Sequence, residues 1–175
     1  MRISMYAMAA DSFVPALQSL ALLLDKGAAH AKGKNLDLVN ARLASDMYTL
    51  AQQVQQACYY AKDGAGRLTG RESAPMEDAG KTFAELQADI ARTIDHVRGI
   101  PAAAFDNAEE RDCSIEPPNA NIVIAMDGLS WLRAWALPHF YFHVATAYGI
   151  LRHNGVVIGK QDYMSWIGAF IRPRK

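Results

Sequence analysis

One stretch near the C-terminal end constrains the fold most, because it predicts a helix that is apolar on almost every face. It runs from Pro138 to Gly155. Proline is favoured at the first position of a helix and glycine just past the last one, so both ends of this helix are marked. A helix that is apolar on nearly all faces is usually buried among other helices. We therefore expect an all-α protein built around this helix.

Three earlier stretches carry the three-and-four-residue spacing of apolar side chains that is typical of helices. We predict helices from about 12 to 32, from 36 or 38 to 68, and from 78 to 98. The first would have Asp11 or Ser12 as its N-cap and Pro15 in its first turn, and the third would have Asp78 as its N-cap. Together with 138–155 they predict a four-helix bundle in one domain that spans residues 1–175.

The connection between the third and fourth helices is long and irregular. It covers residues 100–130, which predicts a crossover topology rather than a tight turn. Within it, the β-prone run 122–126 could pair with 114–116 as a short hairpin. Residues 131–135 read either as a third short strand or as a helical lead-in. Residues 161–170 predict a short C-terminal helix that caps the bundle.

Charge and cysteine content exclude several classes of protein. Eighteen basic residues balance eighteen acidic ones, so the overall charge gives no case for nucleic-acid or anionic-membrane partners. We find no run that approaches the ~20 apolar residues of a membrane span. Two cysteines, Cys58 and Cys113, are too few for a disulfide framework, and they favour a reducing, cytoplasmic location.

Large aromatic side chains near the C-terminal end predict self-association. Four of them exceed what one small bundle readily buries, so we predict a homodimer through a helix face. They are Trp131, Trp135, Trp166 and Phe170.

Two histidines on the central helix are the strongest candidates for a functional site. His139 and His143 are four residues apart, so they lie on one helical face. Two neutral imidazoles one turn apart can bind a divalent cation if another helix adds a ligand. The spacing alone is a weak signal, because in a bundle such a pair is often two core or edge histidines. On the predicted second helix, Gln53 and Asp46 are polar residues near the inner face.

Several motifs resemble a known bacterial family. They are Asp11–Leu17, Arg42–Tyr48 with Gln52-Gln53-Val54, Phe142–Tyr148, Ile150–Val156 and Gly159-Lys160. With them the chain resembles DUF1993, a family within the DinB/YfiT-like superfamily of four-helix bundles. The resemblance implies a metal held by three histidines, two of them a pair on the fourth helix, where His139 and His143 lie here. The third ligand should come from the middle of the second helix, which contains no histidine; Gln53 is the nearest polar residue.

Two functional interpretations follow. In the first, the chain is a non-catalytic module that binds a small ligand or a partner through a degenerate metal pocket, with no cofactor. That pocket would comprise Gln53, Asp46, Tyr48, His143 and Tyr148. In the second, the chain is a metal-dependent hydrolase or thiol transferase that holds zinc or nickel on His139 and His143, with Tyr48 or Tyr148 as proton donor. We favour the first because one ligand is missing and a fold does not determine a function.

Overall fold

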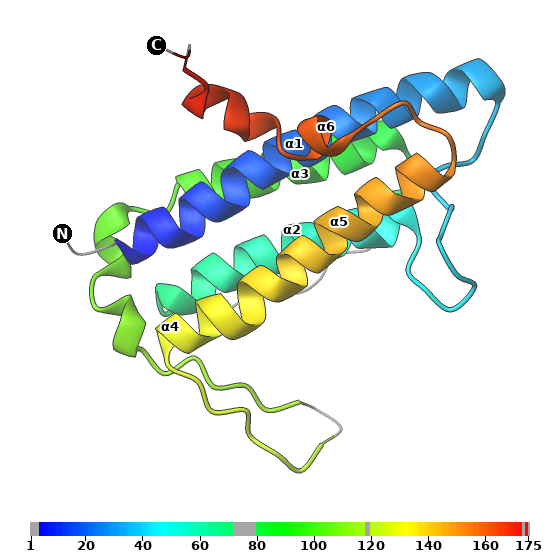
Figure 1. The fold of residues 1–175 in the computed structure, drawn as a ribbon. Helices are drawn as coiled ribbons and strands as arrows, with labels where there is room; N and C mark the ends of the chain where they lie inside the picture. The colour runs from blue at the N-terminus through cyan, green and yellow to red at the C-terminus, as the bar shows by residue number, and fades with distance from the viewer. Residues whose placement is uncertain (1–3, 72–79, 118–119, 173, 175) are drawn as a thin grey trace.

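Four long helices dominate the computed structural model, which describes residues 4–71, 80–117, 120–172 and 174 (Figure 1). They are α1 (Met5–Lys34), α2 (Leu50–Leu68), α3 (Phe83–Arg98) and α5 (Leu137–His153). They run side by side, with α2 packed against α5 and α1 packed against α3. No strand occurs in the described part of the chain, so the predicted all-α class is confirmed.

Helix α1 begins earlier than the sequence pattern predicts. Ser4 is the N-cap, and its hydroxyl accepts a hydrogen bond from the Ala7 N–H, so Asp11 and Ser12 are not caps. Pro15 consequently lies inside the helix instead of in its first turn. Helix α1 is long and apolar enough to cross a membrane by length and composition, but 56% of its most apolar window is buried inside the protein. We therefore interpret it as a core helix of the bundle.

The second helix begins at Leu50, so the prediction of a start near 36 or 38 is wrong. Thr49 and Gln52 form a capping box: the Gln52 N–H donates to Thr49 Oγ1 at 3.3 Å, and the Thr49 N–H donates to Gln52 Oε1 at 2.9 Å. Such reciprocal bonds satisfy N–H groups that a helix start leaves unpaired. The preceding loop is fastened by a hydrogen bond from the Leu50 N–H to the Ala41 carbonyl. Asp46 lies exposed in this loop, so it is not on the inner face of the second helix as predicted.

Helix α3 begins at Phe83 and is also set by a capping box. Thr82 Oγ1 accepts from the Glu85 N–H at 3.2 Å, and Glu85 Oε2 accepts from the Thr82 N–H at 3.0 Å. The predicted start near 78 is therefore too early. Asp78, the predicted cap, lies outside the described residues.

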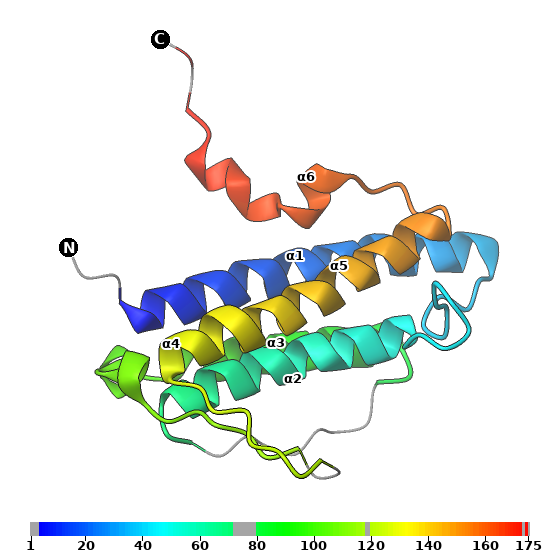
Figure 2. The same ribbon diagram turned by 60° about the horizontal axis from the view of Figure 1, so that its bottom comes forward.

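The crossover leads from α3 to the fourth long helical segment, Gly128–His153, which we call the fourth rod. It contains short turns and the predicted hairpin. The turns are η1 (Ala102–Phe105) and η2 (Ala108–Glu110). The hairpin is confirmed as two isolated antiparallel bridges, Asp112 with Asp127 and Ile115 with Ile124. The crossover folds beside the ends of α2 and the fourth rod, as Figure 2 shows.

The fourth rod is helical from Gly128 to His153, which makes the predicted start at Pro138 wrong. It consists of α4 (Gly128–Ser130), the π-helical η3 (Trp131–Ala136) and α5. Asp127 caps it, because its Oδ1 accepts from the Ser130 N–H at 2.7 Å. The wider π-type turns end at Ala136, two residues before Pro138, which has no N–H to donate. The stretch 131–135 is therefore the helical lead-in. Gly155, just past the end, has a φ of 82°, as the sequence predicts.

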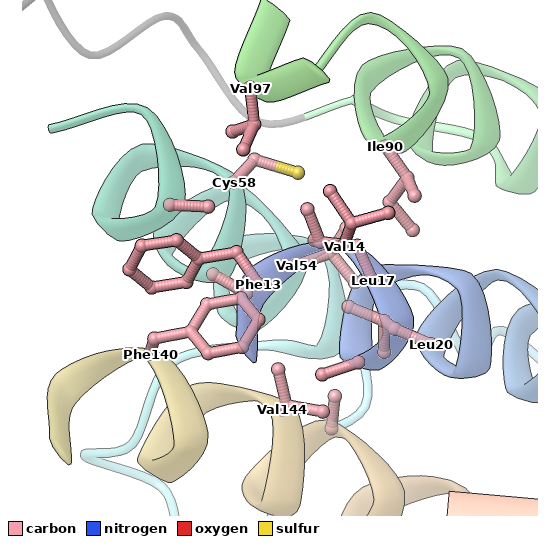
Figure 3. Close-up of a cluster of buried hydrophobic side chains, with 14 of the residues drawn as sticks. Phe13, Val14, Leu17, Leu20, Val54, Cys58, Ile90, Val97, Phe140 and Val144 are labelled. Atoms are coloured by element: carbon pink, nitrogen blue, oxygen red, sulfur yellow. The ribbon is translucent and has the colours of Figure 1, made fainter. Parts of the chain in front are cut away.

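The core fills the space between the four rods (Figure 3). The rings of Phe13 and Phe140 meet edge to face with centroids 5.0 Å apart, and both side chains are fully buried. The two cysteines are free and buried, so the prediction that they form no disulfide framework is confirmed. Cys58 is buried and therefore serves as a small core side chain. The same burial raises the pKa of its thiol to about 11.

The C-terminal segment lies against α1 on the outside of the bundle (Figure 2). It consists of α6 (Lys160–Tyr163) and η4 (Ser165–Phe170), so the single helix predicted over 161–170 is divided at Met164. The Ser19 and Ser165 hydroxyls share a hydrogen bond of 2.5 Å, and Lys26 pairs with Asp162 at 2.6 Å.

Trp131 is fully buried, which corrects one part of the dimer prediction. Of the four aromatic side chains on which that prediction depends, Trp135 and Trp166 are half-buried, and only Phe170 is strongly exposed. The homodimer stays a prediction.

Candidate functional site

A hydrogen bond between α2 and α5 is the centre of the candidate site. The His143 Nδ1–H donates to Gln53 Oε1 at 2.7 Å, because an amide oxygen can only accept. Gln53 is 1% exposed and His143 is 7% exposed. The Gln53 amide group in turn donates to the Tyr48 carbonyl at 3.4 Å. The two side chains therefore satisfy each other in a buried position, as expected from their facing places on the two helices.

His139 is held in a similar way, but by its own helix. Its Nδ1–H donates to the Trp135 carbonyl at 2.8 Å, which is one turn earlier. Since the oxygen partner accepts, the neutral ring carries its proton on Nδ1 and keeps a lone pair on Nε2. The same holds for His143. Both imidazoles are thus fixed in one tautomer by an oxygen from the protein.

The two imidazoles are also linked by the ring of Tyr60 on α2. Tyr60 stacks on His139 with centroids 4.6 Å apart and on His143 with centroids 5.6 Å apart, at interplanar angles of 23° and 11°. Burial, more than the neighbouring Tyr59, raises the pKa of the Tyr60 hydroxyl, so it stays protonated at neutral pH.

This stack continues in both directions. Beyond His139 it passes to Trp135, with centroids 4.5 Å apart, and from Trp135 to the buried Trp131, with centroids 6.2 Å apart. Beyond His143 it reaches Tyr48, 6.3 Å away and 47% exposed. We call these six rings the ring column. It runs along the α2–α5 seam from the core to the surface.

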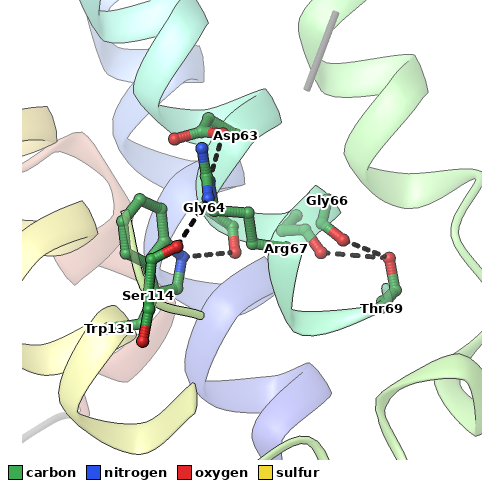
Figure 4. A network of polar contacts seen from close by, with 8 residues as sticks. Asp63, Gly64, Gly66, Arg67, Thr69, Ser114 and Trp131 are labelled. Atoms are coloured by element: carbon green, nitrogen blue, oxygen red, sulfur yellow. Dashed lines mark hydrogen bonds and ion pairs between the residues drawn. The ribbon is translucent and has the colours of Figure 1, made fainter. Parts of the chain in front are cut away.

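A polar network holds the buried end of the ring column (Figure 4). Arg67 Nε donates to the buried Asp63 carboxylate at 3.0 Å, and Arg67 Nη1 donates to the Ser114 carbonyl at 3.4 Å. The Arg67 guanidinium also lies 5.0 Å from the centre of the Trp131 ring. Burial raises the pKa of Asp63 although Arg67 opposes this shift. These contacts tie the crossover to α2, so we assign them a structural role.

The burial of His143 has an electrostatic consequence. Desolvation, and to a smaller extent the neighbouring His139, lowers the pKa of His143 from its ordinary value of 6.5 to about 4. The imidazole is therefore neutral at pH 7, which agrees with a ring that donates from Nδ1 only.

We predict that His143 makes the protein less stable in mild acid. Because the unfolded chain takes up the proton near pH 6.5 and the folded chain only near pH 4, stability is fully present above pH 6.5 and is lost as the pH falls through this window. The loss between pH 7 and pH 5 should be about 2 kcal/mol. Urea unfolding at both pH values measures it. In a His143→Asn variant the difference between the two pH values should shrink by that amount; an unchanged difference would exclude His143 as its source.

The other predicted site residues do not all join this cluster. Tyr48 does, through its ring and its carbonyl. Tyr148 instead contacts the Tyr163 ring of α6, and within the described chain no ring contact or hydrogen bond joins it to either histidine. Asp46 is exposed in the loop before α2.

Sequence reasoning missed Tyr60 as a member of the site. A signal for it was present, because Tyr60 follows Gln53 by seven residues and therefore lies on the same face of α2, two turns on. The sequence pattern was used to place Trp135 only on a dimer surface. Trp135 precedes His139 by one helical turn, so it also lies beside this histidine.

Comparison with known proteins now assigns the family. A family model for DUF1993, a domain of unknown function, matches residues 5–164. The chain belongs to the DUF1993 family. A crystal structure described as a DinB family member from Shewanella denitrificans is similar to this DUF1993 protein, with a TM-score of 0.83, 38% sequence identity, and coverage of 97% of this chain and 94% of that one. No protein with a curated description matches. The predicted DinB-like fold is confirmed.

Among the residues that the structure describes, the side chains of this DUF1993 protein do not fit a three-ligand metal centre. Within the described residues, no group of three or more His, Cys, Asp or Glu side chains could hold a metal ion. Gln53, which lies where the third ligand is expected, uses its oxygen to accept the His143 Nδ1–H. Asp46 lies in the loop outside α2. An amide oxygen is in any case a poor ligand for zinc or nickel.

Proposed function

We propose that this DinB-like protein is a non-catalytic module that binds a small ligand or a partner through the α2–α5 seam. The observation that carries the proposal is the buried 2.7 Å hydrogen bond between His143 and Gln53. It supports a site in which a glutamine has replaced a metal ligand and stabilises one of the two histidines. A replacement of this kind keeps the bundle and removes a centre on which catalysis would depend.

The ring column supports a ligand of defined chemistry. Tyr48, the ring at its outer end, is 47% exposed, so its face offers a stacking contact near the surface. His139 and His143 each keep an Nε2 lone pair that can accept a hydrogen bond. We therefore propose a planar organic molecule that carries at least one N–H or O–H donor.

Metal analysis of the purified protein tests the absence of a resident metal. We expect less than stoichiometric zinc and nickel in the wild-type protein and in a His143→Ala variant alike. The variant should be less stable by about 1–3 kcal/mol, because it leaves the buried Gln53 oxygen without its donor. A His139→Ala variant is the matched control for the other imidazole. One bound metal per chain that is lost in both variants would contradict the proposal.

Ligand titration tests the binding role itself. A panel of planar heteroaromatic compounds with N–H donors should shift the ¹⁵N signals of His139 and His143. The shifts should weaken in a Tyr48→Ala variant, since its ring contacts His143. If no compound in the panel causes shifts, only the version of the proposal in which the seam binds a partner remains. Shifts that are unaffected by Tyr48→Ala would place the ligand elsewhere.

One feature favours the metal-dependent alternative. Both imidazoles donate from Nδ1 to an oxygen and keep Nε2 free, which is how metal-ligating histidines are commonly oriented. In that case His139 and His143 would bind zinc or nickel with water completing the shell, as in a DinB-type hydrolase or thiol transferase. The same metal analysis separates the two functions.

A further inference from the structure

The C-terminal segment presents apolar side chains to solvent. Phe170 is 73% exposed, Ile171 is 69% exposed and Ile167 is 44% exposed. They belong to the end of η4 and to the residue that follows it. Exposed apolar side chains that gather on one short segment indicate an interaction surface more strongly than scattered ones do. We call Ile167, Phe170 and Ile171, with Arg172 and Arg174, the C-terminal tip.

The base of this segment is fixed to the bundle. Ser165 bonds to the buried Ser19 of α1, and Asp162 pairs with Lys26 of the same helix. The Trp166 ring contacts Tyr163, with centroids 6.1 Å apart, and Tyr163 contacts Tyr148 of α5. The apolar side chains farther along are therefore held at a defined place on the surface, beyond a firmly packed base.

The charge of this region is positive and unbalanced, although the whole chain is neutral. After Asp162 the sequence has three basic residues and no acidic one. Asp162 itself is neutralised by Lys26. The Arg172 guanidinium donates to the carbonyls of Ala169 and Ile171, at 3.0 and 2.9 Å, which keeps its charge next to the exposed apolar side chains.

We propose that the C-terminal tip docks on an anionic lipid surface. Apolar side chains beside basic ones match the acyl–headgroup boundary of such a membrane, where apolar burial and attraction to anionic lipids add together. With only three apolar side chains, the contact is weak, reversible and peripheral. The neutral net charge of the whole chain does not reveal this surface, because its basic residues are gathered in one short segment. The surface is separate from the α2–α5 seam, so this inference does not depend on the function proposed there.

Co-sedimentation of the full-length protein with vesicles tests the proposal. At low salt, we expect about fivefold more protein bound to mixed phosphatidylcholine–phosphatidylserine vesicles than to pure phosphatidylcholine vesicles. The difference should disappear at high salt, in an Arg172→Glu/Arg174→Glu variant and in a Phe170→Ser/Ile171→Ser variant. Val157→Ser is the matched apolar control, because Val157 is 84% exposed in another loop. It should bind as the wild type does.

Three results would overturn the proposal. Equal binding to both kinds of vesicle would remove the electrostatic part, and binding that survives both tip variants would locate the contact elsewhere. Analytical ultracentrifugation without lipid supplies the third. A dimer that dissociates in the Phe170→Ser/Ile171→Ser variant would show that a second copy of the chain covers the tip.

Discussion

A Trp131→Ala variant is expected to lose about 3–5 kcal/mol of unfolding free energy, the range for deleting a large buried aromatic side chain. Trp131 is fully buried, and its indole N–H donates to the Gly64 carbonyl at 3.3 Å (Figure 4). Its ring also contacts the Arg67 guanidinium and Trp135. Its removal therefore leaves a cavity, deletes the hydrogen bond to the Gly64 carbonyl and weakens one end of the ring column. Urea denaturation followed by circular dichroism measures the loss.

Two companion variants separate these contributions. Trp131→Phe keeps most of the ring and deletes the N–H, so it should cost less than Trp131→Ala by the cavity contribution. Trp166→Ala, at a half-buried tryptophan of η4, should cost much less than Trp131→Ala. Equal losses at positions 131 and 166 would contradict the assignment of Trp131 to the core.

A Gly128→Ala variant should be destabilised by at least about 3 kcal/mol, because the contact it creates is with backbone. A Cβ at Gly128 would lie 1.8 Å from the Ala108 carbonyl oxygen and 3.1 Å from a Leu68 methyl carbon. A carbonyl oxygen cannot rotate away as a long side chain can. The start of the fourth rod and the η2 turn would have to separate, and the melting temperature reports the result.

Gly33→Ala is the matched control for this glycine. Gly33 is exposed near the end of α1, and a Cβ there meets nothing within 4 Å. Alanine in a helix is more favourable than glycine by roughly 0.5–1 kcal/mol, so Gly33→Ala should be neutral or slightly stabilising. A Gly128→Ala protein as stable as the wild type would mean that the η2–α4 contact is looser than in the structure.

The long helices could be predicted from sequence because their apolar spacing is strong, but their starts could not. The Leu43 and Met47 positions continue the α2 pattern toward the N-terminus, but the capping box at Thr49 and Gln52 starts the helix only after them. On the fourth rod, Pro138 suggests a first turn, yet Asp127 caps the helix much earlier. Side-chain bonds to a few backbone N–H groups decided these starts, and apolar periodicity does not register such bonds.

The candidate site was predictable where two helices had to face each other. His143 and Gln53 were placed in one pocket, and a hydrogen bond joins them across the seam. Asp46 was misplaced because its position depended on the wrong helix start. The column through Tyr60 and Trp135 depends on the axial offset between α2 and α5, which a single sequence does not specify.

Long-range ¹H–¹⁵N spectra of the histidine rings test the central claim most directly. If Gln53 holds His143 as a neutral ring, Nδ1 carries the proton and Nε2 is bare from pH 8 down to about pH 5, and equimolar zinc leaves the signals of both His139 and His143 in place. A proton on Nε2 of His143, or zinc that shifts both histidines together, would contradict the account.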